Sequence, residues 1–395
     1  MIVEKLIVQG FKSIESVELD LGNVNVFIGA NGSGKSNLLE AFGALAAAAF
    51  GRVDSESLVR RGGRLGGFFR PLFRDSPAFG ETVLEAEGAN SCYRVSLAAP
   101  ESSRSTGWEF RREIWKGGDE ELVNRTAGNG AKGDPQAGLA ALKLAETAPD
   151  TDAARFLKRL AHYAIYSPET LMLRGVIPDP QTREPVGLSG GRLAQAVSEL
   201  MDAGEPGARL GKEIQEAVEW FGGFGIMRTR VENDPRSEIH GLAFIDKYFR
   251  TEDPETKKGH HYFMSPMDVN EGVLYEMFMG VLCLHPSAPK LLAIDNGDHG
   301  LNPLLAKHLI GAVCRWLLES ERPRQLLMTT HNPLVLDGLL LQDDRVRLFT
   351  VDRDNRGATR VRRFVISDQH REMAEKGWTL SRMWVNKLIG GVPDV

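Results

Sequence analysis

The chain has 395 residues, of which 42% are hydrophobic and 26% charged, with a formal net charge of -5 at pH 7. This composition is ordinary for a globular chain, and the length allows one large α/β domain with an insertion or two smaller domains. The net negative charge excludes a general attraction to polyanions, so any nucleic-acid contact must be a local patch.

The cysteines and the apolar pattern bear on location. Cys92, Cys283 and Cys314 lie far apart without a CxxC pair, which argues against a disulfide framework or a zinc site and favours a reducing cytoplasm. The sequence contains no apolar signal-peptide core at its start and no run of about 18 apolar residues. We therefore expect a cytoplasmic protein without membrane contact.

The first half of the chain predicts strands, one helix and then more strands. Residues 4–11 and 16–22 alternate in hydrophobicity and residues 24–29 form an apolar run, so three short strands are expected. An alanine-rich helix follows from about Lys35 to Phe50. Residues 82–115 predict an antiparallel meander, and the glycine-rich residues 117–138 predict a loop.

The second half changes from helices to alternating elements. Helical patterns dominate residues 139–222, strands return at 224–250, and 251–261 predict a loop. Beyond residue 271 helices alternate with buried strands, as in a parallel sheet with crossover helices. The expected organisation is an N-terminal part of the core with a β lobe (1–138), a mainly helical insertion (139–239) and a C-terminal part of the core (240–395).

One short segment carries a specific motif. GANGSGKS at residues 29–36 fits the phosphate-loop pattern G-x-x-x-x-G-K-[ST], between a buried strand and a helix. The glycines let backbone N–H groups point at phosphate oxygens, and the helix N-terminus adds positive potential. Lys35 would reach the β- and γ-phosphates while the Ser36 hydroxyl would bind Mg²⁺. The motif predicts ATP with Mg²⁺ as the ligand.

The sequence around this motif resembles a known family. Residues 11–42, FKSIESVELDLGNVNVFIGANGSGKSNLLEAF, are similar to the N-terminus of RecF/SMC-like ABC ATPases, especially the OLD-type ATPases of prokaryotic defence and DNA maintenance. The resemblance implies an α/β fold of the ABC-type P-loop NTPases, with a mixed or parallel sheet core, an antiparallel β lobe and a helical insertion. The expected nucleotide-binding residues are Lys12, Ser13, Gly29, Ala30, Asn31, Gly32, Ser33, Gly34, Lys35, Ser36, Asn37, Asn270 and Gly272.

A second phosphate motif lies in PKLLAIDNGDHGLNP, residues 289–303. Asp295 ends an apolar strand and would hold Mg²⁺ together with Ser36, the alternative being an ordinary capping acid. The resembling family has Glu at the next position, where this chain has Asn296. An amide cannot accept a proton from water at neutral pH, so we expect hydrolysis to be about 10²–10⁴ times slower. Asp298 and His299 are alternative bases.

Two further features of the resembling family have candidates here. His331, after a second apolar strand, resembles the switch histidine that contacts the γ-phosphate, so the expected catalytic residues are Asp295, Asn296 and His331. The eye-catching Leu-Ser-Gly-Gly at 188–191 ends 104 residues before Asp295, too far for the ABC signature, whereas Gly272 lies only 23 residues before it. We interpret 188–191 as a helix N-cap with closely packed glycines. Asn302 occupies the place of the loop that crosses to the partner subunit.

Residues 59–74 contain five arginines and three phenylalanines without an acid. Guanidinium groups interleaved with aromatic rings suit phosphate contacts and base stacking, while the alternative is a loop with packed rings and solvated arginines. The candidate nucleic-acid-binding residues are Arg60, Arg61, Arg64, Arg70 and Arg74.

The sequence predicts an ATP-binding, slowly hydrolysing ATPase whose ATP-dependent homodimer gates a DNA-related or anti-phage process. Asn270 and Gly272 of each copy would close on the nucleotide of the other. Only 64 residues follow His331, too few for a fused TOPRIM nuclease, so an effector would be a separate protein. The alternatives are a non-catalytic ATP-sensing scaffold and a RecF-like DNA-binding maintenance factor.

Overall fold

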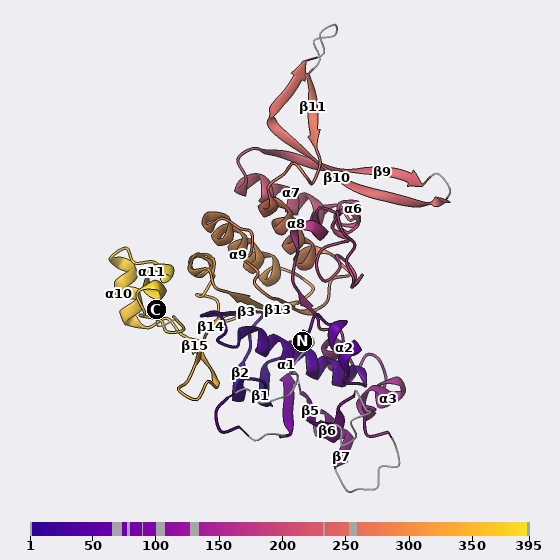
Figure 1. Cartoon of the computed structure of the whole chain (residues 1–395), viewed down its shortest axis with the longest axis vertical. Coiled ribbons are helices and arrows are strands. Elements are labelled where there is room, and N and C mark those ends of the chain that lie inside the picture. The colour runs from indigo at the N-terminus through magenta and orange to yellow at the C-terminus, as the bar shows by residue number, and fades with distance from the viewer. Residues whose placement is uncertain are drawn as a thin grey trace. The chain divides into compact units, whose positions relative to one another are not determined.

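The computed structural model describes residues 2–64, 73–76, 80–88, 90–99, 107–126, 134–231, 234–252 and 259–392. The chain folds into two compact units, each assembled from non-consecutive segments (Figure 1). Unit 1 consists of Met1–Tyr166, Pro289–Asp298 and Leu317–Val395, and unit 2 consists of Ser167–Ala288 and His299–Trp316. The chain up to Tyr166 therefore belongs to unit 1, whereas the part that begins at Ser167 contributes segments to both units.

A six-stranded mixed sheet forms the centre of unit 1, in the order β15-β14-β3-β13-β12-β8. All neighbours are parallel except β14 and β15, which are antiparallel. Strands β3, β12 and β13 are buried along their whole length, as expected for parallel strands covered on both faces. The bounds are β3 (Val24–Gly29), β8 (Ile165–Tyr166), β12 (Leu291–Ile294), β13 (Gln325–Thr330), β14 (Val346–Arg353) and β15 (Thr359–Phe364).

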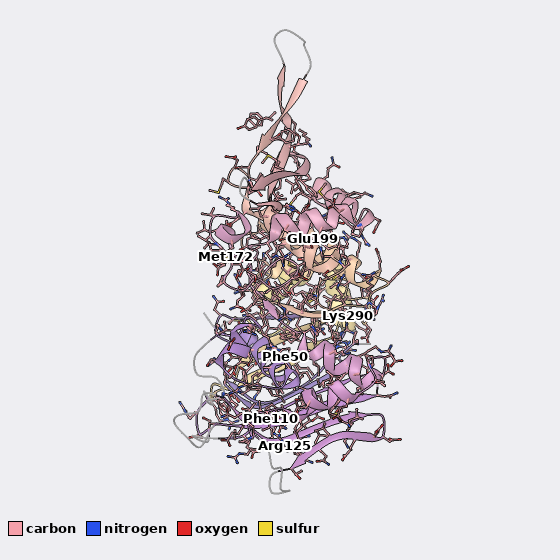
Figure 2. The ribbon with its side chains drawn as sticks, turned by 90° about the vertical axis from the view of Figure 1, so that its right-hand side faces the viewer. Phe50, Phe110, Arg125, Met172, Glu199 and Lys290 are labelled. Atoms are coloured by element: carbon pink, nitrogen blue, oxygen red, sulfur yellow. The ribbon has the colours of Figure 1, made fainter. Side chains whose placement is uncertain are left out.

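The second sheet of unit 1 is antiparallel, in the order β2-β1-β4-β5-β6-β7. Its strands are β1 (Lys5–Phe11), β2 (Ile14–Asp20), β4 (Thr82–Gly88), β5 (Ser91–Ala98), β6 (Glu109–Gly117) and β7 (Glu120–Thr126). The meander expected at 82–115 is confirmed, but the loop expected from 117 is wrong at β7, because this polar segment pairs with β6. Arg125 of β7 lies over the ring of Phe110, 5.7 Å from its centroid (Figure 2). Residues 127–133 of the expected loop lie outside the described residues.

Helix α1 (Lys35–Phe50) is buried on nearly all sides and shares one hydrophobic core with strands of both sheets. A helix surrounded in this way must be apolar all round, and its alanines permit a close approach of the strands. Arg159 of α4 donates to the carbonyl oxygens of Lys290 (2.7 Å) and Pro323 (2.8 Å). The remaining helices of unit 1 are α2 (Ser55–Val59), α3 (Leu139–Glu146), α4 (Asp152–Ala161), the 3₁₀ helix η1 (Pro333–Gly338), α10 (Asp368–Glu375) and α11 (Leu380–Val385).

Unit 2 combines helices with a three-stranded antiparallel sheet in the order β11-β10-β9. Strands were expected at 224–250 and are confirmed, but β10 continues to Glu252 and β11 begins at Gly259, so the loop expected at 251–261 is wrong at both ends. Its middle, 253–258, lies outside the described residues. The elements are α5 (Thr170–Leu173), α6 (Leu193–Asp202), α7 (Glu205–Ala217), β9 (Phe221–Val231), β10 (Asp234–Glu252), β11 (Gly259–Met264), α8 (Glu271–Leu284) and α9 (Pro303–Leu318).

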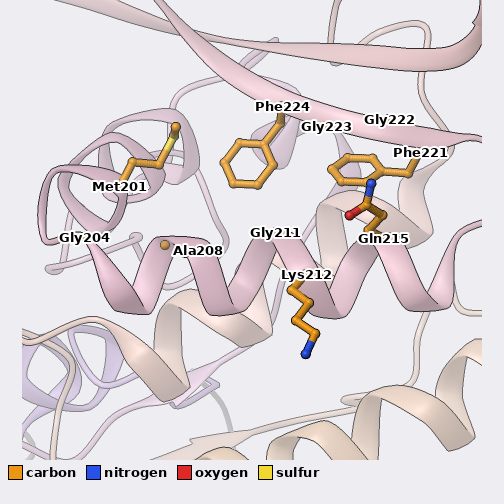
Figure 3. Close-up of a pocket in the computed structure, with 11 residues that line it drawn as sticks. Met201, Gly204, Ala208, Gly211, Lys212, Gln215, Phe221, Gly222, Gly223 and Phe224 are labelled. Carbon is orange, nitrogen blue, oxygen red and sulfur yellow. The ribbon is translucent and has the colours of Figure 1, made fainter.

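A hollow of about 480 Å³ lies along α7 in unit 2. Gly207 and Gly211 of α7 contribute no side chain to its lining, and the rings of Phe221 and Phe224 point toward it from β9 (Figure 3). Five of the lining residues are glycines, so the hollow is a feature of packing between α7 and β9. Among the described residues, no helix is both long and apolar enough to cross a bilayer.

Candidate nucleotide-binding site

The phosphate loop connects the end of β3 to the start of α1 in unit 1. Gly32 (φ +76°) and Gly34 (φ +107°) adopt left-handed backbone conformations, which explains why glycine stands at both positions. The Lys35 ammonium donates to the carbonyl oxygens of Gly29 (2.8 Å) and Ala30 (2.9 Å). The loop therefore curls around its own lysine, with the N-terminus of a four-turn helix directly behind it.

Burial lowers the pKa of Lys35, although the charges of Asp295 and Asp298 oppose the shift. The Lys35 residue is only 7% exposed, so two carbonyl oxygens replace most of its hydration. Carbonyl dipoles compensate an ammonium charge less well than an anion does. A phosphate group would therefore stabilise the charged form of Lys35.

The predicted metal ligands lie side by side. Asp295 follows β12, and its Oδ1 accepts a hydrogen bond from the Ser36 hydroxyl at 3.0 Å. Thr329 of β13 donates a second hydrogen bond to the same oxygen. Hydroxyl and carboxylate oxygens are the hard donors that Mg²⁺ prefers, so Ser36 and Asp295 fit this ion. Thr329, which orients the carboxylate, escaped the sequence analysis because a threonine within a strand carries no motif.

Asn296 has an unusual backbone. It is exposed, its φ is +53°, and its N–H donates to the Thr329 hydroxyl at 2.8 Å. Asn is one of the few residues that adopt this left-handed conformation readily. The left-handed backbone at this position thus favours Asn. Its side-chain amide cannot act as a base.

The two alternative bases, Asp298 and His299, and the candidate switch histidine, His331, differ in their surroundings. Asp298 is 6% exposed, and its buried Oδ1 has no hydrogen-bond partner among the described residues. His299 belongs to unit 2, where its Nδ1 lies 3.0 Å from the Tyr275 hydroxyl. His331 is exposed directly after β13 in unit 1. Of these three residues, Asp298 is the one whose charge raises the pKa of Lys35, as the charge of Asp295 also does.

The turn between β1 and β2 is fastened to α1. Lys12 (φ +49°) forms a buried ion pair with Glu40 of α1, and Glu40 also accepts from Arg64 Nε at 2.7 Å. Burial alone would raise the pKa of Glu40, but hydrogen bonds from the two cations hold it below its usual value. Lys12 thus supports the helix that follows the phosphate loop, and Ser13 beside it contacts Asn37 and Thr359.

The five arginines proposed for nucleic acid do not form one exposed surface in the structure. Arg61 is 5% exposed and donates to the carbonyl oxygens of Ser57 and Ala161, so its assignment is wrong. Its guanidinium satisfies backbone acceptors that would otherwise be buried without donors. Arg64 is held by Glu40, Arg60 pairs with Glu56, and Arg74 is exposed. Arg70 lies outside the described residues.

The residues expected to contact a partner's nucleotide lie together in unit 2. Asn270 is the N-cap of α8, where its Oδ1 accepts from Val273 N–H at 3.2 Å. Asn270 and Gly272 line a hollow of about 390 Å³ together with Asn302 and Trp220. The capping bond uses the amide oxygen, and the amide NH₂ group has the donors that a phosphate needs. Trp220 was not singled out from the sequence, because an isolated tryptophan has no motif.

The Leu-Ser-Gly-Gly segment has a structural environment within unit 2. Buried Asp179 accepts from the N–H groups of Ser189 (2.8 Å) and Gly191 (3.4 Å). A Cβ on Gly190 would lie 2.3 Å from Leu173 Cδ2, so the close packing expected of these glycines is present. The N-cap interpretation is wrong, since α6 begins after Arg192 without a side-chain cap.

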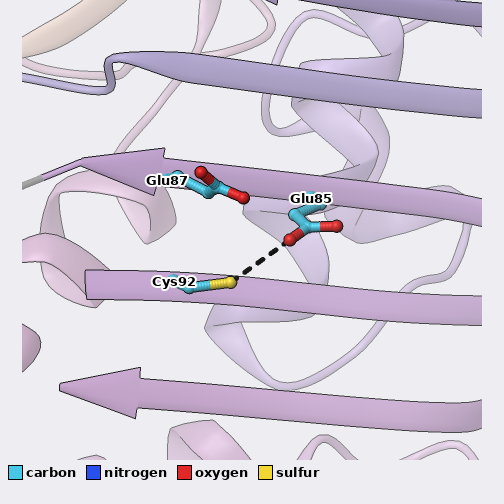
Figure 4. A group of neighbouring side chains, drawn as sticks. All are labelled: Glu85, Glu87 and Cys92. Atoms are coloured by element: carbon cyan, nitrogen blue, oxygen red, sulfur yellow. Dashed lines mark hydrogen bonds between the residues drawn. The ribbon is translucent and has the colours of Figure 1, made fainter. Parts of the chain in front are cut away.

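Another group of possible metal ligands lies on the antiparallel sheet of unit 1. Ligand atoms of Glu85, Glu87 and Cys92 lie within 4.8 Å of one another (Figure 4). Cys92 Sγ donates to Glu85 Oε1 at 3.4 Å, and Arg94 donates to Glu85 Oε2 at 2.9 Å. The arginine and the thiol already satisfy the Glu85 carboxylate, so the cluster is explained by contacts within the sheet.

The comparison with protein families matches the segment that contains the phosphate loop. Residues 1–91 match the family model described as an AAA ATPase domain. The DNA replication and repair protein RecF of Renibacterium salmoninarum is 35% identical over 132 residues, 33% of each chain. RecF of Paenarthrobacter aurescens is 40% identical over 110 residues, 26% of this chain and 27% of the relative. The matched part thus spans about a third of the length of these relatives or less.

One solved structure covers nearly the whole chain. The SMC head bound to the C-winged helix domain of ScpA is similar with a TM-score of 0.53 and 14% identity, over 93% of this chain and 99% of that one. At this identity the likeness concerns the fold alone. The predicted fold class is confirmed: the chain has the α/β fold of the ABC-type P-loop ATPases, with a mixed central sheet and an antiparallel sheet.

Proposed function

We propose that the protein is an ATP-binding, slowly hydrolysing ATPase of the RecF/SMC type. The observation that carries the proposal is the convergence of Lys35, Ser36 and Asp295 at the end of β3 and β12, with Asn296 in place of a carboxylate. Lys35 would hold the phosphates, while Ser36 and Asp295 would hold Mg²⁺, which neutralises charge between the β- and γ-phosphates. Asn296 and His331 would orient the attacking water and the γ-phosphate.

The expected consequence is a long-lived ATP state. Two copies would pair head to tail, so that Asn270 and Gly272 of each close on the nucleotide of the other. The binding of ATP would stabilise the closed dimer before hydrolysis, and slow hydrolysis would delay the opening of this dimer. The OLD-type resemblance supports a defence process with a separate effector protein as one setting for this switch.

The residue that decides between a slow enzyme and a non-catalytic ATP sensor is Asn296. Asn296→Asp restores a carboxylate in a residue that tolerates the left-handed backbone, and Asn296→Glu restores the longer side chain of the resembling family. We expect one of these variants to raise kcat for MgATP by about 10² or more, with little change in KM. Steady-state phosphate release measures both constants.

Three control variants complete this experiment. Lys35→Ala should abolish binding, and Asn296→Ala should be no faster than wild type. Asp298→Asn tests the neighbouring carboxyl group, because a loss of the residual activity would identify Asp298 as the substitute base. If the wild type and both carboxylate variants release no phosphate while MgATP still binds, the protein is a non-catalytic ATP-sensing scaffold.

A DNA-maintenance function is the second candidate, and the identity with the two RecF proteins supports it. Of the arginines proposed to contact DNA, Arg60, Arg64 and Arg74 keep side chains that reach solvent. Binding through phosphate contacts weakens steeply with salt. Salt-dependent binding to duplex or single-stranded DNA, reduced by Arg60→Ala and Arg74→Ala, would establish this function.

A further inference from the structure

We propose that Thr359 of β15 is a positioning residue for the phosphate loop. Its hydroxyl would set the geometry in which residues 29–36 meet a phosphate, so the β14–β15 hairpin would tune nucleotide affinity. This inference rests on the proposed nucleotide binding. Thr359 lies more than 300 residues after the phosphate loop in the sequence and would control nucleotide binding by that loop.

The hairpin fits against the phosphate loop without spare room. Thr359 is fully buried, and a Cβ on Gly34 would lie only 2.1 Å from its Oγ1. A Cβ on Gly29 would likewise lie 2.1 Å from the carbonyl oxygen of Val351 on β14. Positions 29 and 34 of the motif are therefore glycine partly because this hairpin approaches them so closely.

A chain of hydrogen bonds, in which each group donates to the next, links the hairpin to residues on either side of Lys35 and Ser36. The Thr359 hydroxyl donates to the Ser33 carbonyl oxygen at 2.9 Å. Since it has one proton, it must accept from the Ser13 hydroxyl, 2.7 Å away. Ser13 Oγ in turn accepts from Asn37 Nδ2 at 2.7 Å. The chain therefore runs from the first turn of α1 through β15 to the loop, and its ends flank Lys35 and Ser36.

The hairpin is also fastened independently of this hydroxyl. Thr359 N–H donates to the Ser13 carbonyl oxygen at 2.7 Å. Arg356 pairs with Glu15 of β2, and Arg360 bonds both Glu15 (3.2 Å) and Asp354 (2.6 Å). Removing the Thr359 hydroxyl should leave these contacts in place, so the effect of the hydroxyl on the loop can be separated from folding of the hairpin.

The matched variants are Thr359→Val, which keeps the shape and loses the hydroxyl, and Thr359→Ser, which keeps the hydroxyl. Amide hydrogen exchange of residues 30–36 in the nucleotide-free protein should be about tenfold faster in Thr359→Val, because the Ser33 carbonyl loses this donor and the Ser13 hydroxyl loses its acceptor. Thr359→Ser should exchange like wild type. Equal exchange in Thr359→Val and wild type, or equally fast exchange in both variants, would overturn the inference.

The second measurement is the dissociation constant of a fluorescent ATP analogue with Mg²⁺. We expect about tenfold weaker binding for Thr359→Val and near-wild-type binding for Thr359→Ser. A lower melting temperature with unchanged affinity would mean that Thr359 only stabilises the fold, which would refute the positioning role. If Thr359→Val does not fold, Ser13→Ala breaks the same chain from its other side and should give the same faster exchange in the nucleotide-free protein, and unchanged exchange would overturn the inference.

The two proposals fail in different ways. A wild-type protein that binds no MgATP would end the proposed function, whereas the exchange measurement uses no nucleotide and still decides whether Thr359 orders the loop. Wild-type binding with a Thr359→Val variant that is unaltered in exchange and affinity would end only the present inference.

Discussion

Glu40 is a buried polar group that is matched to specific partners. It is 3% exposed and accepts from both Lys12 and Arg64. A buried carboxylate that lost these cations would be costly, since an uncompensated charge in the interior destabilises by several kcal/mol. The same environment that ties the β1–β2 turn to α1 therefore leaves Arg64 less available for other ligands.

At Cys92 a neighbouring carboxylate disfavours the ionised form of a buried side chain. Burial, followed by the charge of Glu85, raises the pKa of its thiol to about 12. The reactive thiolate is then scarce at pH 8, and Cys283 and Cys314 are buried. We predict that the native protein reacts slowly with a thiol reagent at pH 8 and that all three cysteines react after unfolding in denaturant.

Glu85→Gln is the matched control for this prediction. It removes the charge that opposes the Cys92 thiolate but keeps a hydrogen-bonding side chain. The labelling rate of Cys92 should rise in this variant, as followed by mass spectrometry of the modified peptide. A native wild-type Cys92 that reacts as fast as a free thiol would contradict the prediction.

Helix α8 contains a carboxyl group without hydrogen-bond partners at its centre. Glu276 is fully buried, and neither of its oxygens has a partner among the described residues. Burial, reinforced by the charge of Glu213 on α7, raises the pKa of Glu276 to about 8. The helix therefore accommodates the neutral acid at neutral pH, and ionisation would place an uncompensated charge in unit 2.

This shift predicts how stability depends on pH. The favourable contribution of neutral Glu276 is complete below its unfolded pKa of about 4.5 and is lost as pH rises toward the folded value of about 8. Glu276→Gln mimics the neutral acid. Its melting temperature should match wild type near pH 5 and exceed it by roughly a few degrees at pH 8.5, as measured by calorimetry. A difference independent of pH would contradict the assignment.

The elements show which parts of the site a sequence can reveal. Strand β3, the loop and α1 were predicted because one continuous segment contains the apolar run, the glycines and Lys35. Asp295 was found for the same reason. Strand β7 was not, because its polar residues form a strand only by pairing with β6. Thr359 was not found either, since its contact with Ser33 depends on the order of strands in the sheet.

Arg61 and the segment at 188–191 show a different limit. Composition indicates that arginines are solvated, whereas Arg61 is buried and its guanidinium donates hydrogen bonds to two backbone carbonyl oxygens. Sequence distance argued against Leu-Ser-Gly-Gly as the signature, but it did not reveal that Asp179 accepts a hydrogen bond from this segment. Local patterns predict chemistry well and predict the partners of buried polar groups poorly.

At the scale of the whole molecule, the proposed switch requires two copies. We expect the wild-type protein to be monomeric without nucleotide and dimeric with MgATP in small-angle scattering, because slow hydrolysis would prolong the closed state. Gly272→Glu places a charge where a Cβ already meets Leu305 at 2.9 Å and should prevent dimer formation. Lys35→Ala should prevent it by removing nucleotide binding. A monomer that binds MgATP tightly would refute the dimer.

The order of strands in the central sheet also affects how the protein is made. Strand β3 ends at residue 29, but its two neighbours, β13 and β14, begin at residues 325 and 346. At a synthesis rate of about 5–20 residues per second, this apolar strand waits roughly 15–60 s for its neighbours. Unpaired apolar strands invite aggregation. The nascent chain therefore carries β3 unpaired during this time, and a product released before residue 346 would lack one edge of its sheet.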